Sequence, residues 1–387
     1  MLTKNIKFKT FKTYSNGNKI KKIIESNWFK NIKLIRSLNI NYKYSYSKKD
    51  LKKYKKFKSF RVFGMGGSIL GAEAIYQFMR HKIKKNFIFI NNLKPNFTKN
   101  ERNKKMVNLV VSKSGNTLET ISNLNILLKK KTTNKNIFII ENKNNYLSKI
   151  AKKIKAEVFE HKNFIGGRYS ILSEVGMLPA ELMGLKEKKF KKYNYLINNK
   201  NFINNLVSNV SSTLKLNRQG KSNSIILNYD EKSENFFKWY QQLIAESLGK
   251  KSKGILPIIS AMPKDNHSLM QFYLDGSKNN FYTFFNVKEK KSERIINNNL
   301  LKPYQYLRNK TLYKILVSQM EATQRIFKRK NLPFRSFEIL NRTEDSLGEL
   351  FCFFIMETIL LGRALNINPF DQPSVELVKT ETKKILL

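Results

Sequence analysis

Short apolar runs alternate with stretches of helical periodicity along most of the chain. In the first half, runs rich in Val, Ile and Phe occur at residues 59–66, 86–92, 106–114, 136–143 and 156–161. Amphipathic segments such as SILGAEAIYQFMR separate them. Strands that alternate with helices in this way predict a doubly wound parallel sheet. In such sheets, ligands bind beyond the carboxyl ends of the strands.

The second half of the chain repeats this pattern. Strand-like runs lie at 224–229, 254–262, 281–289 and 334–340. The segment 346–367 is apolar on nearly every face, so it is expected to be a helix buried between layers. The predicted fold class is therefore α/β, with two doubly wound parallel-sheet domains that look like two versions of one architecture.

A chain of 387 residues is long for a single core, and two domains are the natural expectation. Apolar spacing near the start predicts a helical N-terminal extension over residues 1–50 that leads into a first domain at 51–185. A polar, basic linker at 186–201 then opens the second domain, which spans 186–365. A loop and a helix at 366–387 are expected to form a C-terminal arm.

Composition excludes several classes of protein. Hydrophobic residues make up 41% of the chain and aromatic residues 12%, which is enough to build real cores. Cys352 is the only cysteine, which excludes a disulfide framework and a Cys-rich metal site. The three histidines, His81, His161 and His267, show no metal-ligand spacing. Without a secretory signal or an apolar run of about 18 residues, a soluble cytoplasmic protein with no membrane contact is expected.

The net charge of +46 raises the question of nucleic-acid binding. Lys far outnumbers Arg and is dispersed over all segments, together with many Asn and Ile, as AT-rich codons would produce. Surfaces that grip phosphates and read bases usually favour the forked guanidinium of Arg. Biased codon usage is therefore the preferred explanation, and no nucleic-acid partner is expected. A positive field would still attract an anionic substrate.

Two loops that follow strands have the composition of phosphate-binding loops. Residues 64–68 (GMGGS) combine three glycines with the start of a helix, which suits close approach to an anion. The dinucleotide pattern GxGxxG is absent because residue 69 is Ile. Residues 112–117 (SKSGNT) offer three hydroxyls, a cation and helix-start amides. A tight packing turn and simple helix capping are the respective alternatives.

Two further stretches carry candidate catalytic groups. Arg168 follows two glycines and can stabilise negative charge that develops on a substrate oxygen. Glu246 shares a helix face with Gln242 and Lys250, and its apolar neighbours favour partial burial, which makes a carboxylate a stronger base. The alternative for Arg168 is a surface side chain in a turn. For Glu246 it is a surface ion pair with Lys250, which spacing alone favours.

His267 and Lys379 are weaker candidates. His267 follows a predicted strand in MPKDNHSLMQF, where an imidazole can shuttle protons near neutral pH. Lys379 lies in the C-terminal segment, near Gln372. Taken singly, each is more simply explained by structure, as a loop histidine and a solvated lysine on a terminal helix.

Six segments of the chain, taken together, resemble one known family. They occur in the order GMGGSILG, SKSGNTLET, GGRYSILSEVGMLP, QQLIAESLGK, DNHSLMQ and FDQPSVELVK. This set is similar to the glucose-6-phosphate isomerase (phosphoglucose isomerase) family, whose members have two sugar-isomerase (SIS) domains and a C-terminal arm. The resemblance runs from about residue 60 to residue 380.

The resemblance implies a reversible aldose–ketose isomerisation of glucose 6-phosphate and fructose 6-phosphate, in glycolysis and gluconeogenesis. Ring opening would be assisted by His267 and Lys379. Glu246 would move a proton between C1 and C2 through a cis-enediol, with Arg168 stabilising the enediolate. The residues implied to hold the substrate and its phosphate are Gly67, Ser68, Ser112, Lys113, Ser114, Thr117, Gln242 and Gln372. A homodimer in which His267 reaches the neighbouring subunit's site is also implied, with no metal or organic cofactor.

Some features depart from the family pattern. Pro373 and Ser374 stand where many members have Trp-Gly, and the chain is short for the family. Two alternatives therefore stay open: another SIS-type isomerase that accepts both glucose and mannose phosphates, and a non-catalytic SIS protein that binds sugar phosphates.

Overall fold

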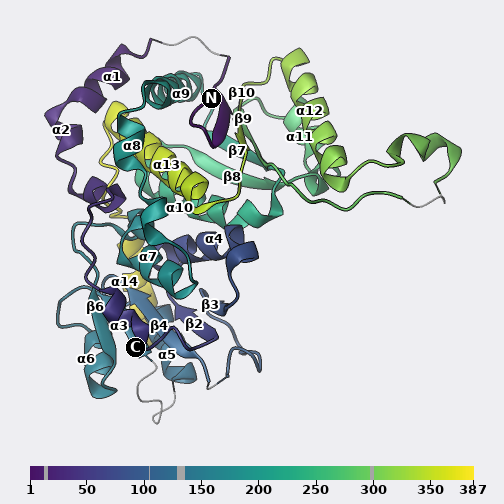
Figure 1. The fold of residues 1–387 in the computed structure, drawn as a ribbon. Helices are drawn as coiled ribbons and strands as arrows, with labels where there is room; N and C mark the ends of the chain where they lie inside the picture. The colour runs from purple at the N-terminus through teal and green to yellow at the C-terminus, as the bar shows by residue number, and fades with distance from the viewer. Residues whose placement is uncertain (13–15, 104, 129–135, 297–299) are drawn as a thin grey trace.

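The computed structural model describes residues 1–12, 16–103, 105–128, 136–296 and 300–387. Two five-stranded sheets lie one above the other, with a layer of helices between them (Figure 1). Both sheets are built from parallel strands apart from one edge strand. The two doubly wound parallel sheets expected from the hydrophobic pattern are present.

The first sheet has the strand order β3-β2-β4-β5-β6, and all its pairs are parallel. Its strands are β2 (Ser59–Phe63), β3 (Asn86–Ile90), β4 (Val107–Ser112), β5 (Asn136–Ile140) and β6 (Glu157–Glu160). From β2 the chain moves to one side to form β3 and then to the other side to form β4. This reversal makes the gap between the carboxyl ends of β2 and β4 the place where a ligand is expected.

The second sheet has the order β1-β10-β9-β7-β8. Its parallel strands are β7 (Asn223–Asn228), β8 (Leu256–Ala261), β9 (Asn280–Val287) and β10 (Phe334–Ile339). Strand β1 (Ile6–Lys9) pairs antiparallel with β10 at the edge. The same reversal occurs here, because β8 and β9 lie on opposite sides of β7.

Strand β1 was not among the predicted elements. The first fifty residues were expected to be helical and to lead into the first domain, yet β1 completes the sheet of the second half. Its four residues alternate between buried and exposed, and the ring of Phe8 lies 4.6 Å from that of Phe337. A four-residue alternation among lysines is too short to be recognised without its partner strand.

Helices cover both faces of both sheets. The helices of the first half are α1 (Asn18–Glu25), α2 (Asn27–Lys30), α3 (Lys48–Lys52), α4 (Leu70–Phe78), α5 (Leu118–Leu127), α6 (Tyr146–Lys153) and α7 (Glu174–Leu182). Those of the second half are α8 (Tyr193–Ile197), α9 (Lys200–Arg218), α10 (Glu234–Leu248), α11 (Met270–Asp275), α12 (Leu312–Arg329), α13 (Glu344–Ala364) and α14 (Val375–Leu386). Helices α9 and α12 were not predicted.

One hydrophobic core joins the two halves of the molecule. Alternate residues of each strand point toward it, as Phe60 and Val62 of β2 and Ile226 of β7 do. Helices α4 and α7 from the first half meet α10 and α13 from the second in this shared layer (Figure 1). The outer face of the first sheet has its own core under α5 and α6, and that of the second under α11 and α12. The two sheets are therefore held together by a continuous core.

Helix α13 is buried on nearly all sides, as its composition predicted. The segment 186–201, expected to be a polar linker, packs against it instead of crossing solvent. Phe190 and Leu196 are fully buried, and a Cβ on Gly348 of α13 would lie 2.3 Å from the carbonyl oxygen of Phe190. Phe190 and Leu196 help to anchor this segment, together with the ion pair of Lys192 with Asp345. In the described part of the chain, no helix combines the length and hydropathy needed to cross a membrane.

Lys191, in this same segment, is buried and connects two distant parts of the fold. Its ammonium donates hydrogen bonds to the carbonyl oxygens of Ser37 and Leu172. It also lies 4.8 Å from the ring centre of Tyr42 and 4.9 Å from that of Tyr44. Burial lowers the pKa of Lys191 to about 7, because the charged form is poorly solvated there.

This lowered pKa makes a testable prediction about stability. Between about pH 7 and the ordinary lysine value of 10.5, the unfolded chain binds a proton at Lys191 that the folded chain does not. The contribution of Lys191 to stability should therefore rise with pH in this window, by at most about 1.4 kcal/mol per pH unit. We expect the free energy of unfolding of the wild type, relative to Lys191→Met, to increase between pH 7 and pH 9 in urea titrations.

The matched control is Lys188→Met, which removes an exposed lysine three residues away. Its difference from the wild type should stay flat over the same pH range. Parallel pH dependence in the two variants would show that the effect is one of overall charge.

Candidate active site

The two predicted phosphate loops leave the first sheet side by side. Residues 64–68 follow β2 and residues 112–117 follow β4, and these strands are direct neighbours. The first loop forms a 3₁₀ turn, η2 (Gly66–Ser68), before α4, and the second ends at the N-terminus of α5. Both loops therefore lie in the gap where the direction of winding reverses.

Glycine is required in the first loop by close contact with other chain segments. A Cβ on Gly67 would lie 2.2 Å from the carbonyl carbon of Gly167 and 2.4 Å from the amide nitrogen of Arg168. Gly66 has a φ of +50°, and a Cβ there would lie 2.7 Å from Nε2 of Gln242. The loop thus touches both the Arg168 turn and helix α10, which places three of the predicted motifs together.

The second loop is organised by its own hydroxyl groups. Ser112 Oγ lies 3.0 Å from Thr117 Oγ1 and accepts a hydrogen bond from the amide of Gly115 at 3.2 Å. Thr117 is the N-cap residue of α5 but makes no side-chain capping bond. Helix capping therefore does not account for this threonine. Gly115 has a φ of +66°, and a Cβ there would collide with the side chain of Asn145.

Lys113 lies at one side of this loop. Its Nζ donates to the carbonyl oxygen of Asn163 at 2.8 Å and lies 3.6 Å from Oε1 of Glu141. Burial lowers the pKa of Lys113, and Glu141 partly opposes this effect. A half-buried cation that pairs only loosely with one carboxylate is well suited to hold an added anion.

Arg168 is the centre of the site and only 1% of its surface is exposed. It lies in η4 (Gly167–Leu172). Its guanidinium donates to Ser247 Oγ at 2.7 Å, to the carbonyl oxygens of Pro369 and Asp371 at 2.8 and 2.9 Å, and to the side chain of Gln372. It therefore fastens the segment after α13 to the first domain. The alternative of a surface arginine is wrong.

Glu246 extends from α10 toward Arg168. Its Oε1 lies 3.2 Å from Arg168 Nη1, and its Oε2 accepts a hydrogen bond from Gln242 at 2.8 Å. Its side chain is 19% exposed, so it can still be reached by a small molecule. Lys250 pairs with Asp371 at 2.7 Å instead of Glu246. The simple surface pair of Glu246 with Lys250 is therefore wrong.

Gln242 retains unused hydrogen-bonding capacity. Its amide nitrogen is engaged by Glu246, but its buried Oε1 has no partner within the described residues. A buried acceptor without a donor is costly, and a ligand hydroxyl would relieve that cost.

His267 and Lys379 make no contact with this cluster that the described residues of the chain show. His267 is exposed just after β8, an edge strand of the second sheet. Lys379 is exposed on α14 and pairs with Glu376 of the same helix at 2.6 Å. In the described part of the chain, neither forms a hydrogen bond or ion pair with Arg168 or Glu246.

Sequence reasoning missed two residues that support Arg168. Ser247 is fully buried and accepts the Nε–H of Arg168, and Tyr169 Oη lies 2.9 Å from the same serine oxygen. Tyr169 also donates to the carbonyl oxygen of Pro369 at 3.0 Å. Both residues stand next to a predicted site residue, but nothing local distinguishes them from core residues.

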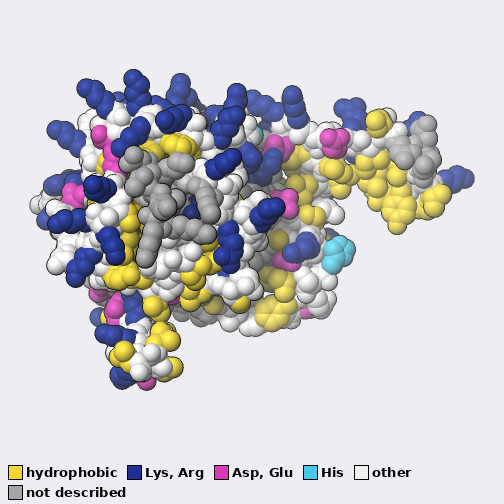
Figure 2. Space-filling model, turned by 90° about the horizontal axis from the view of Figure 1, so that it is seen from below, with side chains coloured by type: hydrophobic (Ala, Val, Ile, Leu, Met, Phe, Trp, Pro, Cys, Tyr) yellow, Lys and Arg dark blue, Asp and Glu magenta, His cyan; other side chains and the backbone are white. Residues whose placement is uncertain are grey.

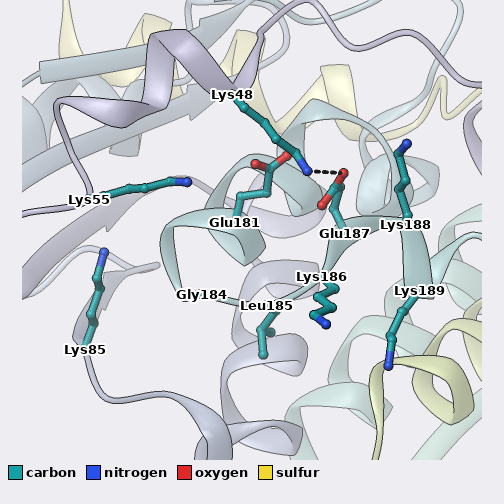
Figure 3. Close-up of a pocket in the computed structure, with 10 residues that line it drawn as sticks. All are labelled: Lys48, Lys55, Lys85, Glu181, Gly184, Leu185, Lys186, Glu187, Lys188 and Lys189. Carbon is teal, nitrogen blue, oxygen red and sulfur yellow. Dashed lines mark ion pairs between the residues drawn. The ribbon is translucent and has the colours of Figure 1, made fainter.

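The lysine-rich hollow shown in Figure 3 is separate from the candidate active site. This cavity of about 490 Å³ lies near the amino ends of the first sheet, since Lys55 and Lys85 precede β2 and β3. Its lysines splay in different directions, and Lys48 pairs with Glu187 at 3.7 Å. Figure 2 likewise shows Lys and Arg side chains spread over the visible face.

The chain is an α/β protein of two doubly wound sheets, with a buried arginine and a reachable carboxylate beside a phosphate-type loop. A family model described as phosphoglucose isomerase matches residues 47–261. The glucose-6-phosphate isomerase of Methanocaldococcus jannaschii is 32% identical over 358 residues, covering 87% of this chain and 86% of that protein. The chain therefore belongs to the phosphoglucose isomerase family.

Solved structures share the fold. A hypothetical protein from Thermus thermophilus superposes with a TM-score of 0.83 at 21% identity, covering 95% of this chain and 94% of its own. A glucose-6-phosphate isomerase from Chlamydia trachomatis gives a TM-score of 0.71 at 18% identity, covering 97% and 80%. The second structure is the longer of the two chains, since the superposition covers 80% of it.

The glycine contacts predict which substitutions the site tolerates. We expect Gly67→Ala to destabilise the fold by about 1–3 kcal/mol, because its Cβ would meet backbone atoms that cannot rotate away. Turnover should fall at least tenfold as the first loop moves from Arg168. Chemical denaturation and an isomerase assay would measure the two effects.

Gly166→Ala is the control, since its Cβ would find its nearest neighbour, a ring carbon of Tyr169, at 3.6 Å. It should change stability by less than about 0.5 kcal/mol. Equal losses of stability and turnover in the two variants would mean that the flexibility of glycine matters at both positions, and not the backbone contact of Gly67.

Proposed function

We propose that this protein is a glucose-6-phosphate isomerase, which interconverts glucose 6-phosphate and fructose 6-phosphate. The observation that carries the proposal is the contact of Glu246 with Arg168 and Gln242 next to the loop at Gly66 and Gly67. A base, a charge stabiliser and a phosphate anchor are the parts that an aldose–ketose isomerisation needs.

The phosphate of the substrate is assigned to the two loops at the carboxyl edge of the first sheet. Ser68, Ser114 and Thr117 would supply hydroxyl donors, and Lys113 the positive charge. Ser112 is buried and bonded to Thr117, so its part is to hold the loop in shape. The N-terminus of α5 adds free backbone N–H groups and a favourable dipole.

Proton transfer is assigned to Glu246. One carboxylate can serve both carbons, because C1 and C2 are bonded neighbours and the proton leaves and returns on the same face. Gln242 and Arg168 each hold one carboxylate oxygen, which orients the group. Negative charge on the enediolate oxygen would be stabilised by Arg168, whose position is preset by Ser247 and Gln372.

The supporting groups for ring opening are His267 and Lys379, and we propose that a homodimer completes the site. His267 is exposed on the subunit, and exposed apolar side chains follow it, with Leu269 at 37% and Phe272 at 52% exposure. A surface that combines an imidazole with apolar neighbours suits contact with a second copy, which would carry His267 to the partner's Glu246.

A second surface supports association. Residues 288–296 and 300–312 project from the body at the right of Figures 1 and 2. The stem of this projection is closed by a bridge between Arg294 and Thr311. Its described residues include strongly exposed apolar side chains: Ile296, Leu301, Tyr304 and Tyr306. A projection this apolar is stabilised when another protein surface covers it.

The activity can be tested directly. We expect the purified protein to convert fructose 6-phosphate to glucose 6-phosphate without added metal, in an assay coupled to a glucose-6-phosphate dehydrogenase. Mannose 6-phosphate in the same format distinguishes the alternative, an isomerase of dual specificity. Inertness toward both fructose 6-phosphate and mannose 6-phosphate would refute both enzyme proposals and leave sugar-phosphate binding alone.

The role of Glu246 predicts a selective loss. Glu246→Gln should lower kcat by roughly 10²–10⁴-fold, because the amide cannot accept the proton. Calorimetry should still find glucose 6-phosphate bound within a few-fold of the wild-type affinity. Glu234→Gln is the matched control on the same helix, where the carboxylate pairs with Lys238. Retention of most activity by Glu246→Gln would contradict the assignment.

Sharing of His267 between subunits predicts complementation. Glu246→Gln and His267→Ala should each be impaired, but co-expression should restore roughly a quarter of wild-type turnover, since half of the dimers are mixed and each has one intact site. Different affinity tags on the two variants, used one after the other in purification, would isolate the mixed dimers and confirm that they form. Mixed dimers without recovered activity would place His267 in its own subunit's site, and a fully active His267→Ala would place it outside catalysis.

A further inference from the structure

A groove beside the phosphate loop has its own chemistry. It has a volume of about 630 Å³ and runs between the N-terminal helices and the turn that precedes Arg168. The residues that line it are Asn27, Trp28, Asn31, Ile32, Lys33, Leu34, Lys113, Asn163, Phe164, Gly166, Tyr169 and Phe370. Its volume lies within the usual range of small-molecule sites.

Aromatic rings form one wall of this groove. Trp28 is half-buried, with Arg363 over its ring at 5.0 Å and the ring of Phe370 at 6.5 Å. The half-buried Phe164 continues the wall toward the active site, and Tyr169, which is fully buried, borders the groove. Flat apolar walls accept a planar ring by stacking.

The remainder of the lining is polar and its charge is positive. Three asparagine side chains, those of Asn27, Asn31 and Asn163, offer donors and acceptors. The charged lining residues are Lys33 and Lys113, and no described carboxylate lines the groove. A ligand that fits carries a planar ring with hydrogen-bonding groups and a negative charge.

Lys113 belongs to both the groove and the phosphate loop. Its Nζ is bonded to the carbonyl oxygen of Asn163, at the groove wall. Of the described residues of loop 112–117, Lys113 alone lines the groove. An anion in the groove would hold this ammonium away from the substrate phosphate. Occupancy should therefore weaken substrate binding while Glu246 and Arg168 stay in place.

We propose that this groove is a regulatory site for a nucleoside monophosphate, with its base against Trp28 and its phosphate on Lys33 and Lys113. Its regulatory consequence rests on the proposed isomerase function, but binding itself does not. The two can therefore be tested separately.

Binding is tested by calorimetry with adenosine 5′-monophosphate on the full chain. We expect saturable binding to the wild type, with affinity at least about tenfold weaker in Trp28→Ala, since base–aromatic stacking is lost. Trp28→Phe, which keeps a ring, should bind with intermediate affinity, and Lys33→Met should bind more weakly than the wild type. Inorganic phosphate, used as the probe of the catalytic loop, should bind the wild type and Trp28→Ala equally.

Kinetics supply the second readout. The monophosphate should raise the KM for fructose 6-phosphate to a plateau with little change in kcat, and Trp28→Ala should abolish this effect without changing turnover in its absence. Equal binding and equal inhibition in wild type and Trp28→Ala would place the nucleotide at the catalytic loop and overturn the proposal. Absence of calorimetric binding of the monophosphate to the wild type would also overturn the proposal. An inactive wild type that still binds through Trp28 would overturn the proposed function and leave the site standing.

Discussion

The buried guanidinium of Arg168 is the interaction on which the rest of the site depends. Taking this charge out of water is costly, and only a full set of acceptors makes it stable. Those acceptors come from two separate parts of the chain: Ser247 and Glu246 on α10, and the segment that holds Gln372. Removing one partner from such a buried ionic group typically costs about 3–5 kcal/mol. The same contacts that satisfy the arginine therefore position the residues assigned to catalysis.

The shared core explains why this arrangement can be precise. Glu246 lies on a helix of the second half, and Arg168 lies in a turn of the first. Their 3.2 Å contact persists only if the two halves do not move against one another. Helices α4 and α10 pack closely in the common layer, and Gly67 allows the first loop to touch the Arg168 backbone. Close packing of helices and backbone thus supplies the rigidity that a proton-transfer site needs.

The elements that were predicted and those that were missed differ in a physical way. The predicted strands are almost wholly buried, so their sequences are continuous apolar runs that can be recognised without knowledge of the fold. They are β2, β4, β5, β7 and β9. Helix α9 is rich in Asn and Ser, which favour helices weakly, and it forms because Phe202, Leu206 and Val210 pack into the core. Strand β1 forms only because it pairs with β10, and segment 186–201 is ordered by its packing against α13. In each missed case a distant partner decided the local structure.

The sequence by itself determined the α/β class and the two loops after buried strands, because these depend on local periodicity and on residue type. The catalytic candidates rested on the resemblance of six segments to one family. Spacing could not decide whether Glu246 pairs with Lys250 or with Arg168, since both pairings are compatible with one helix face. Only the tertiary structure decided it, by burying Arg168 within reach of Glu246 and turning Lys250 toward Asp371. The reason is that a buried charge must find its partners wherever the fold brings them, and those partners lie up to 204 residues away along the chain.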